Sequence, residues 1–244
     1  MSSPREPESG GAFPQTAWTL VEQAVVAEDV IRDRALNELA AQYWQPIYIY
    51  LRRTGRTMAD AEDLTQAFFV HLLEKKLLDR VRLREVRFRG FLRSVLEHFL
   101  ANTARTASAK KRFARFSFDV HEAEQWLAAC GQATPDAAFD SVWAMERLEA
   151  AFAGLRSELK TSGREWVADA LLERIGMASP EPVSVRELAA RHGVSDNQLS
   201  VAMHRARERL KALLIADLCS DRATPEEAAE ELAAMFAALG KRPG

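Results

Sequence analysis

Apolar residues recur at intervals of three and four along most of this 244-residue chain, and runs that alternate apolar with polar residues are nearly absent. The first spacing gathers apolar side chains on one face of a helix, whereas strict alternation would indicate a half-buried strand. Pro46 interrupts the pattern from Ile31 to Arg53 and is expected to kink or divide that helix. With 48% hydrophobic residues, the chain can bury one large core or two small ones. We therefore expect an all-α protein of two small helical domains.

The expected domain boundaries come from Pro, Gly and Ser punctuation and from changes in charge. We expect a disordered N-terminal tail over residues 1–15, a first helical domain over 16–115 and a linker over 116–135. A second helical domain should follow over 136–215. The remaining residues, 216–244, are expected to form an acidic helical extension.

The cysteines and the N-terminal residues indicate the cellular compartment in which the protein is expected. Cys130 and Cys219 lie far apart and lack metal-ligand spacing, which favours free thiols in a reducing environment. The N-terminal residues have no basic start followed by an apolar run, and no stretch of about 18 apolar residues occurs. We therefore expect a cytoplasmic protein that is not exported and does not span a membrane.

The formal net charge of −2 hides a strong segregation of charge along the chain. Between Arg80 and Arg115 there are eleven Arg and Lys residues against two acids, whereas between Asp119 and Glu149 seven acids face a single arginine. A chain with this dipolar pattern can hold a polyanion with one part and stay soluble with another.

The stretch "TMADAEDLTQAFFVHLL", residues 57–73, predicts a capped helix, because Thr57 is followed three residues later by Asp60. Its large apolar residues form one face, which leaves Glu62, Asp63 and Gln66 pointing elsewhere. These three side chains are either an ordinary solvated face or an acidic and amide surface for a partner.

A second apolar face runs from Phe88 to Leu100 and leaves arginines on the outer side of the same helix. Basic residues lie before and after this helix as well. Basic side chains that flank the buried apolar face of a helix can contact a phosphate backbone. The alternative is that they form an ordinary solvated basic face. The residues expected at this surface are Arg87, Arg89, Arg93, Asn102, Lys110, Lys111 and Arg112.

Residues 183–214, "VSVRELAARHGVSDNQLSVAMHRARERLKALL", predict a helix-turn-helix. Ser184 with Glu187 and Ser195 with Gln198 are two capping boxes, and Gly193 lies in the short turn between the helices. A purely structural helical hairpin is the alternative. On the second helix, the side chains expected to face outward and contact DNA are Asn197, Ser200, His204 and Arg205.

Signals for catalysis are lacking in the sequence. The five histidines occur singly, without metal-ligand spacing, and there is no Gly-rich phosphate loop and no nucleophile motif. We therefore expect no catalytic residues, no metal and no cofactor, and we expect that the protein is not an enzyme.

Taken in order, these features resemble an extracytoplasmic-function sigma factor, the small two-domain initiation subunit of bacterial RNA polymerase. The resemblance covers about residues 16–214. It rests on "YIYLRRTG" with "DAEDLTQAFFVHLL", on "FRGFLRSVLEHFLAN", and on "SVRELAARHGVSDNQLSVAMHRARERLKALL", and on the order of these motifs. The implied partners are the RNA polymerase core and promoter DNA, and the resemblance leaves open whether an anti-sigma factor binds.

The resemblance also implies roles for these segments. The helix matching Ala59 to Leu73 would dock on the clamp helices of the largest polymerase subunit, so that Glu62, Asp63 and Gln66 face a basic coiled coil. The stretch matching Arg80 to Arg105 would open and hold the downstream promoter element. In it, the candidates for strand contact are Arg87, Arg89 and Arg93. The helix from Ser195 to Leu210 would read the upstream element as duplex.

Two points lie beyond the resemblance. A helix-turn-helix regulator or adaptor that does not bind core polymerase is the alternative function. The extension over 216–244 has an apolar stripe at helical spacing, with Glu226, Glu227, Glu230 and Glu231 expected on its outer face. We expect the stripe to pack on the second domain or across the linker, where it could shield a DNA-binding face. A solubilising tail is the alternative.

Overall fold

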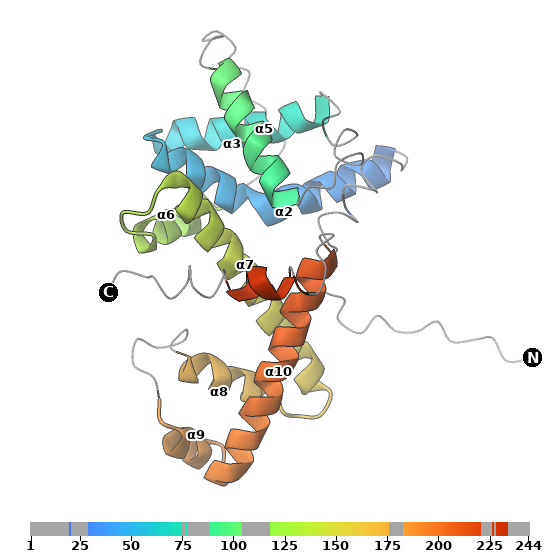
Figure 1. Cartoon of the computed structure of the whole chain (residues 1–244), viewed down its shortest axis with the longest axis vertical. Coiled ribbons are helices and arrows are strands. Elements are labelled where there is room, and N and C mark those ends of the chain that lie inside the picture. Colours follow the sequence, from blue (N-terminus) through green and yellow to red (C-terminus); the bar gives the residue numbers. More distant parts are fainter. Residues whose placement is uncertain are drawn as a thin grey trace, which may run out of the picture. The chain divides into compact units, whose positions relative to one another are not determined.

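The computed structural model describes residues 20, 29–74, 77, 88–103, 118–175, 183–220, 226 and 228–233. The protein is all-α, as predicted, and the described residues contain no strand (Figure 1). Its helices are α2 (Asp29–Arg53), α3 (Met58–Glu74), α5 (Phe88–Thr103), α6 (Val120–Ala129), α7 (Pro135–Lys160), α8 (Trp166–Arg174), α9 (Val185–Arg191) and α10 (Asp196–Ser220).

The chain forms two compact units, whose boundaries fall inside helices α7 and α10. The first, here the basic unit, comprises Thr16–Glu146 with Asp217–Gly244, and the second, here the α10 unit, comprises Arg147–Ala216. Residues 116–135, expected as a linker, include helix α6, which packs on α2. The first part of α7, expected in the second domain, belongs to the basic unit, and so does the extension from Asp217 onward, which was expected to pack on the second domain or across the linker.

The core of the basic unit is built around α2. Pro46 lies inside this helix, which continues through it undivided. Aromatic rings from α3 and α5 fill the space beside it: Tyr43 meets Phe88 edge to face at 5.3 Å, and Phe68 meets Phe99 in the same way at 5.7 Å. Such edge contacts add to the burial of large apolar rings.

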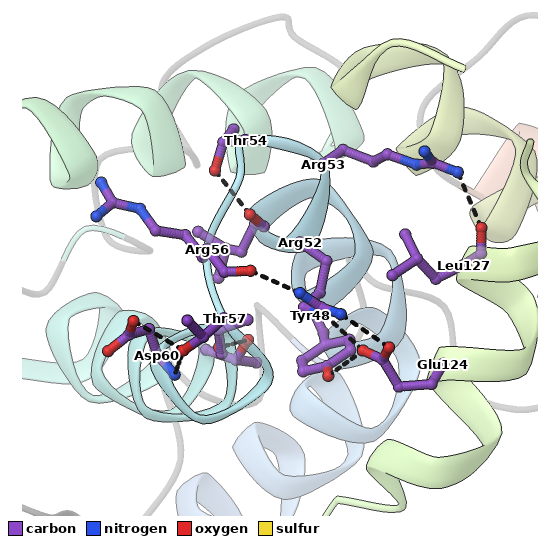
Figure 2. Close-up of polar contacts among 12 residues, drawn as sticks. Tyr48, Arg52, Arg53, Thr54, Arg56, Thr57, Asp60, Glu124 and Leu127 are labelled. Carbon is purple, nitrogen blue, oxygen red and sulfur yellow. Dashed lines mark hydrogen bonds and ion pairs between the residues drawn. The ribbon is translucent and has the colours of Figure 1, made fainter. Parts of the chain in front are cut away.

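Helix α6 is fixed to α2 by a partly buried polar cluster of Tyr48, Arg52 and Glu124 (Figure 2). Asp119 caps the start of α6, accepting hydrogen bonds from the amides of His121 and Glu122 at 3.1 and 3.3 Å. The Glu124 carboxylate accepts hydrogen bonds from Tyr48 Oη at 2.5 Å and from Arg52 at 2.6 and 2.9 Å. The cluster joins residues that are far apart in the sequence, since Arg52 and Glu124 are separated by 72 positions.

The cluster shifts the pKa of its members. The hydrogen bonds from Arg52 lower the pKa of the Glu124 carboxyl below its ordinary value, although burial opposes the change. Burial raises the pKa of Tyr48, and the Glu124 carboxylate raises it further. At neutral pH the cluster therefore holds a carboxylate, a guanidinium and a neutral phenol.

The α10 unit has its own core, formed where α8, α9 and α10 meet. Its buried members are Ala170, Leu188, Ala189, Leu199 and Met203.

Thr134 and Pro135 begin α7 as predicted, because the Ala137 amide donates to Thr134 Oγ1 at 3.3 Å. Both cysteines are free, and in the described ranges no helix combines the length and apolarity needed to cross a bilayer.

Replacing Glu124 with Gln should destabilise the basic unit by about 1–3 kcal/mol, because charged hydrogen bonds to Arg52 and Tyr48 are lost in a partly buried site. Glu122→Gln is the matched control: it removes the same charge from the same helix at an exposed position, and should cost about 0.5 kcal/mol through the helix dipole. Urea unfolding measures both.

The pH dependence follows from the lowered pKa of Glu124. Its contribution is complete above the ordinary carboxyl pKa of 4.5 and is lost as the pH falls through the lower folded value. The stability difference between wild type and Glu124→Gln should therefore shrink below about pH 4.5. A difference that stayed constant to pH 3 would contradict this assignment.

Candidate nucleic-acid and polymerase interfaces

The start of α3 is held rigidly by the turn that joins it to α2 (Figure 2). Thr54 Oγ1 donates to the Leu51 carbonyl at 2.7 Å, and Arg52 Nη1 donates to the Arg56 carbonyl at 2.7 Å. Thr57 Oγ1 accepts from the Asp60 amide at 3.1 Å and donates to the Asp60 carboxylate at 2.8 Å, which is the predicted helix cap. Arg52 thereby connects α6, through Glu124, to the entrance of α3.

The acidic and amide side chains of α3 lie away from its packed face. Ala61, Thr65 and Phe68 are fully buried, and Thr65 Oγ1 donates back to the Ala61 carbonyl at 2.7 Å. Asp63 is exposed, whereas Glu62 and Gln66 are half-buried. Gln66 follows Asp63 by three residues and Glu62 by four, so it neighbours both on the helix surface. The three side chains form one small polar surface.

Helix α5 buries one face and carries basic residues beside it. Phe88, Leu92, Leu96 and Phe99 are buried. Arg89 and Arg93 are half-buried and Asn102 is exposed. The other predicted members of this surface lie outside the described residues; they are Arg87, Lys110, Lys111 and Arg112.

Arg89 is engaged within the chain on every side that the structure describes. Its Nη1 lies 3.1 Å from Asp140 Oδ1, and its Nη2 lies 2.6 Å from Glu231 Oε1. Its guanidinium carbon lies 4.4 Å from the centre of the Trp143 ring, a cation–π contact. The side chain is 24% exposed. Arg89 is therefore neither a solvated cation nor an open phosphate contact in this structure.

Arg93 is held more loosely than Arg89. It lies 3.6 Å from Asp136 and 3.8 Å from Asp140, and its side chain is 37% exposed. Pairs this long and this exposed contribute little to stability. The two arginines are four residues apart on α5, and the two aspartates are four residues apart on α7. This matched spacing is a sequence signal for the pairing of the two helices.

The segment from 226 to 233 differs from expectation at Glu231. Ala228 and Leu232 are buried, as the apolar stripe predicts. Glu231 was expected on the outer face with Glu230, but its side chain is only 6% exposed, because it turns inward to Arg89. The ion pair with Arg89, which lies 142 positions earlier in the sequence, compensates for the burial of its charge.

Helices α9 and α10 are joined by a short turn with a cap on each helix. The Glu187 amide donates to Ser184 Oγ at 3.2 Å. At the start of α10 the bonds are reciprocal: the Gln198 amide donates to Ser195 Oγ at 3.2 Å, and the Ser195 amide donates to Gln198 Oε1 at 2.9 Å. Gly193 adopts a φ of +63° in the turn. The predicted capping box is therefore formed at Ser195, whereas at Ser184 only the serine half is formed, because the Glu187 carboxylate binds Arg191 at 2.6 Å.

Helix α10 presents its polar side chains opposite its packed face. Leu199, Met203, Ala206 and Leu210 are buried. At about 100° per residue, the four predicted DNA contacts cover an arc of roughly 140° on the other side. All four are exposed; they are Asn197, Ser200, His204 and Arg205.

A groove of about 720 Å³ lies beside α10 within the α10 unit. Asn197 and Arg205 line it from α10, and Ser162 and Arg164 line it from the turn after α7. At one place the groove is bridged by Arg209, whose guanidinium binds Glu158 at 2.6 and 2.7 Å. Arg164 adds a positive charge to that of Arg205 in the lining of the groove, whereas the charge of Arg209 is paired with Glu158.

Several of these contacts were missed by sequence reasoning, because their partners are distant in the chain. They include the Glu124 cluster, the stacking of His192 on Trp166 at 4.6 Å, and the acids around Arg89. In the part of the chain that the structure describes, no cluster of His, Cys, Asp and Glu could hold a metal ion. Comparisons with known protein families, with curated proteins and with solved structures find no match to this chain.

The turn between α9 and α10 can be tested with two glycine replacements. Gly193→Ala should destabilise the α10 unit by about 1–2 kcal/mol, because a Cβ is strained at a φ of +63°. Gly90→Ala in α5 is the control: a Cβ there also meets nothing within 4 Å, and the change should stabilise by up to about 1 kcal/mol. Thermal unfolding that moved in the same direction for both would contradict the turn geometry.

Proposed function

We propose that the protein is a promoter-specificity factor of the extracytoplasmic-function sigma type, which binds the RNA polymerase core and directs it to promoter DNA. It would catalyse no reaction itself. Its mechanism would combine recruitment through α3, strand opening through α5 and duplex reading through α10.

The observation that carries the proposal is the exposed polar row of α10. It lies on a helix whose opposite face is packed and whose start is capped behind a tight turn, the arrangement of a helix that enters a groove. Asn197 and His204 can donate to or accept from base edges, whereas Arg205 can reach a phosphate. The arginines of the neighbouring groove would add electrostatic attraction to the backbone.

Support for a polymerase partner comes from the small surface on α3. Glu62, Asp63 and Gln66 share one side of a helix whose start is fixed by two hydrogen-bonded networks, so the surface is preorganised. An acidic and amide surface of this kind is complementary to a basic coiled coil.

For strand opening, the support is the pair of arginines on α5. Arg93 is partly exposed, whereas Arg89 is paired with acids of its own chain. Single-stranded DNA binding combines cations that follow the backbone with apolar or aromatic platforms. In this proposal Arg93 contacts the strand first, and Arg89 contributes once it is released from its acids.

The decisive experiment adds the purified chain to core RNA polymerase and measures promoter-dependent initiation. Asp63→Arg should weaken core binding by about 1–3 kcal/mol, or roughly 5- to 150-fold, because it places a cation against a basic partner. Glu97→Arg is the control, the same change at an exposed site on α5, and should leave core affinity within about twofold. Retention on duplex DNA with no binding to core would instead indicate an adaptor.

DNA reading by α10 is tested separately with duplex binding at several salt concentrations. Arg205→Ala should lower the slope of log affinity against log salt by about one, because one phosphate contact is lost. Arg191→Ala is the control, since Arg191 is paired with Glu173 at 2.7 Å and with Glu187 at 2.6 Å. Equal slopes for wild type and Arg205→Ala would exclude Arg205 from the DNA interface.

A further inference from the structure

Carboxylates of the same chain approach both terminal nitrogens of Arg89. Nη2 lies 2.6 Å from Glu231 Oε1, Nη1 lies 3.1 Å from Asp140 Oδ1, and the guanidinium lies over the Trp143 ring. A phosphate that binds in the bidentate manner typical of arginine needs two of these donors. A phosphate that binds through the Nη1–Nη2 edge must therefore displace the Glu231 carboxylate from Nη2.

The two carboxylates belong to different elements of the basic unit. Asp140 lies within the 26-residue helix α7, beside the fully buried Phe139. Glu231 lies in the segment from 226 to 233, where the buried apolar side chains among the described residues are Ala228 and Leu232. The contact of Arg89 with Glu231 is also the shorter one, at 2.6 Å against 3.1 Å for Asp140, so Glu231 is the carboxylate that an anion on Nη2 must replace.

We infer that Glu231 is an intrachain competitor for the nucleic-acid phosphate that Arg89 would bind, so that the 226–233 segment holds the α5 surface in a low-affinity state. This inference rests on the proposed function and specifies how its α5 surface is regulated. The ligand in question is single-stranded DNA. A buried carboxylate that loses its cation is strongly unfavourable, so Glu231 moves out of its buried position when Arg89 binds a phosphate instead. Phosphate binding and release of the segment are then one coupled step.

The coupling predicts a gain in DNA affinity when the competitor is neutralised. Glu231→Gln keeps the size of the side chain and removes its charge, and Glu230→Gln removes the same charge at the neighbouring exposed position. The full chain is titrated into a labelled single-stranded oligodeoxynucleotide, and binding is followed by fluorescence anisotropy. Glu231→Gln should bind about 5-fold or more tightly than Glu230→Gln. Equal affinities for the two variants would overturn the inference.

A second pair of variants tests whether the effect passes through Arg89. In an Arg89→Ala background, Glu231→Gln should add no affinity, because the group for which Glu231 competes is gone. A gain that persisted there would show a general effect of charge and overturn the inference. If Glu231→Gln unfolds the chain, truncation after Arg222 takes its place, with the same expected gain and the same overturning result.

Core binding, measured in parallel, separates the failure of this inference from failure of the proposed function. If no variant binds core polymerase but Glu231→Gln still tightens single-strand binding through Arg89, the proposed function fails and the competition stands. If wild type supports initiation with core but Glu231→Gln and Glu230→Gln bind DNA equally, the function stands and the competition is refuted.

Discussion

The complete burial of residues 45–51 of α2 is the constraint on which the basic unit depends. Residues 45–51 of this helix are buried without interruption, so the other helices of the unit must pack around it and its polar groups must find partners inside. Tyr48 and Arg52 meet that requirement through Glu124, which draws α6 onto α2. The same guanidinium also binds the carbonyl of Arg56 and thereby fixes the entrance of α3. One partly buried polar cluster thus sets the position of the acidic surface proposed for polymerase.

The acidic and basic stretches that are separated along the sequence form ion pairs with each other in the folded chain. The acids that follow the arginine-rich stretch supply Asp136 and Asp140, which pair with Arg93 and Arg89. This pairing ties α5 to α7, and it also neutralises part of the surface that the proposed function assigns to DNA. A basic surface held by its own acids binds nonspecific polyanions less strongly, because each phosphate must displace a carboxylate. The same ion pairs therefore join α5 to α7 and, under the proposed function, weaken the binding of DNA to α5.

Sequence reasoning was most successful where the determining interactions are local. The starts of α3, α7, α9 and α10 follow from four hydroxyl side chains that each accept a hydrogen bond from the amide three residues later; they are Thr57, Thr134, Ser184 and Ser195. At Pro46 the sequence left two outcomes open, a kinked or a divided helix, and the helix is not divided. Sequence reasoning gave no account of α6, whose first residues are polar and whose attachment to α2 depends on distant groups.

By itself, the sequence determined that the chain is helical, where most helices begin, and which face of each helix is apolar, because these properties depend on neighbours within about four residues. It also placed Asn197, Ser200, His204 and Arg205 on the exposed side of α10, where they lie. Only the tertiary structure decided which charges are free. Glu230 and Glu231 are adjacent and identical in type, yet one is exposed and the other is buried against Arg89. That difference depends on a partner 142 positions away, which no local pattern encodes.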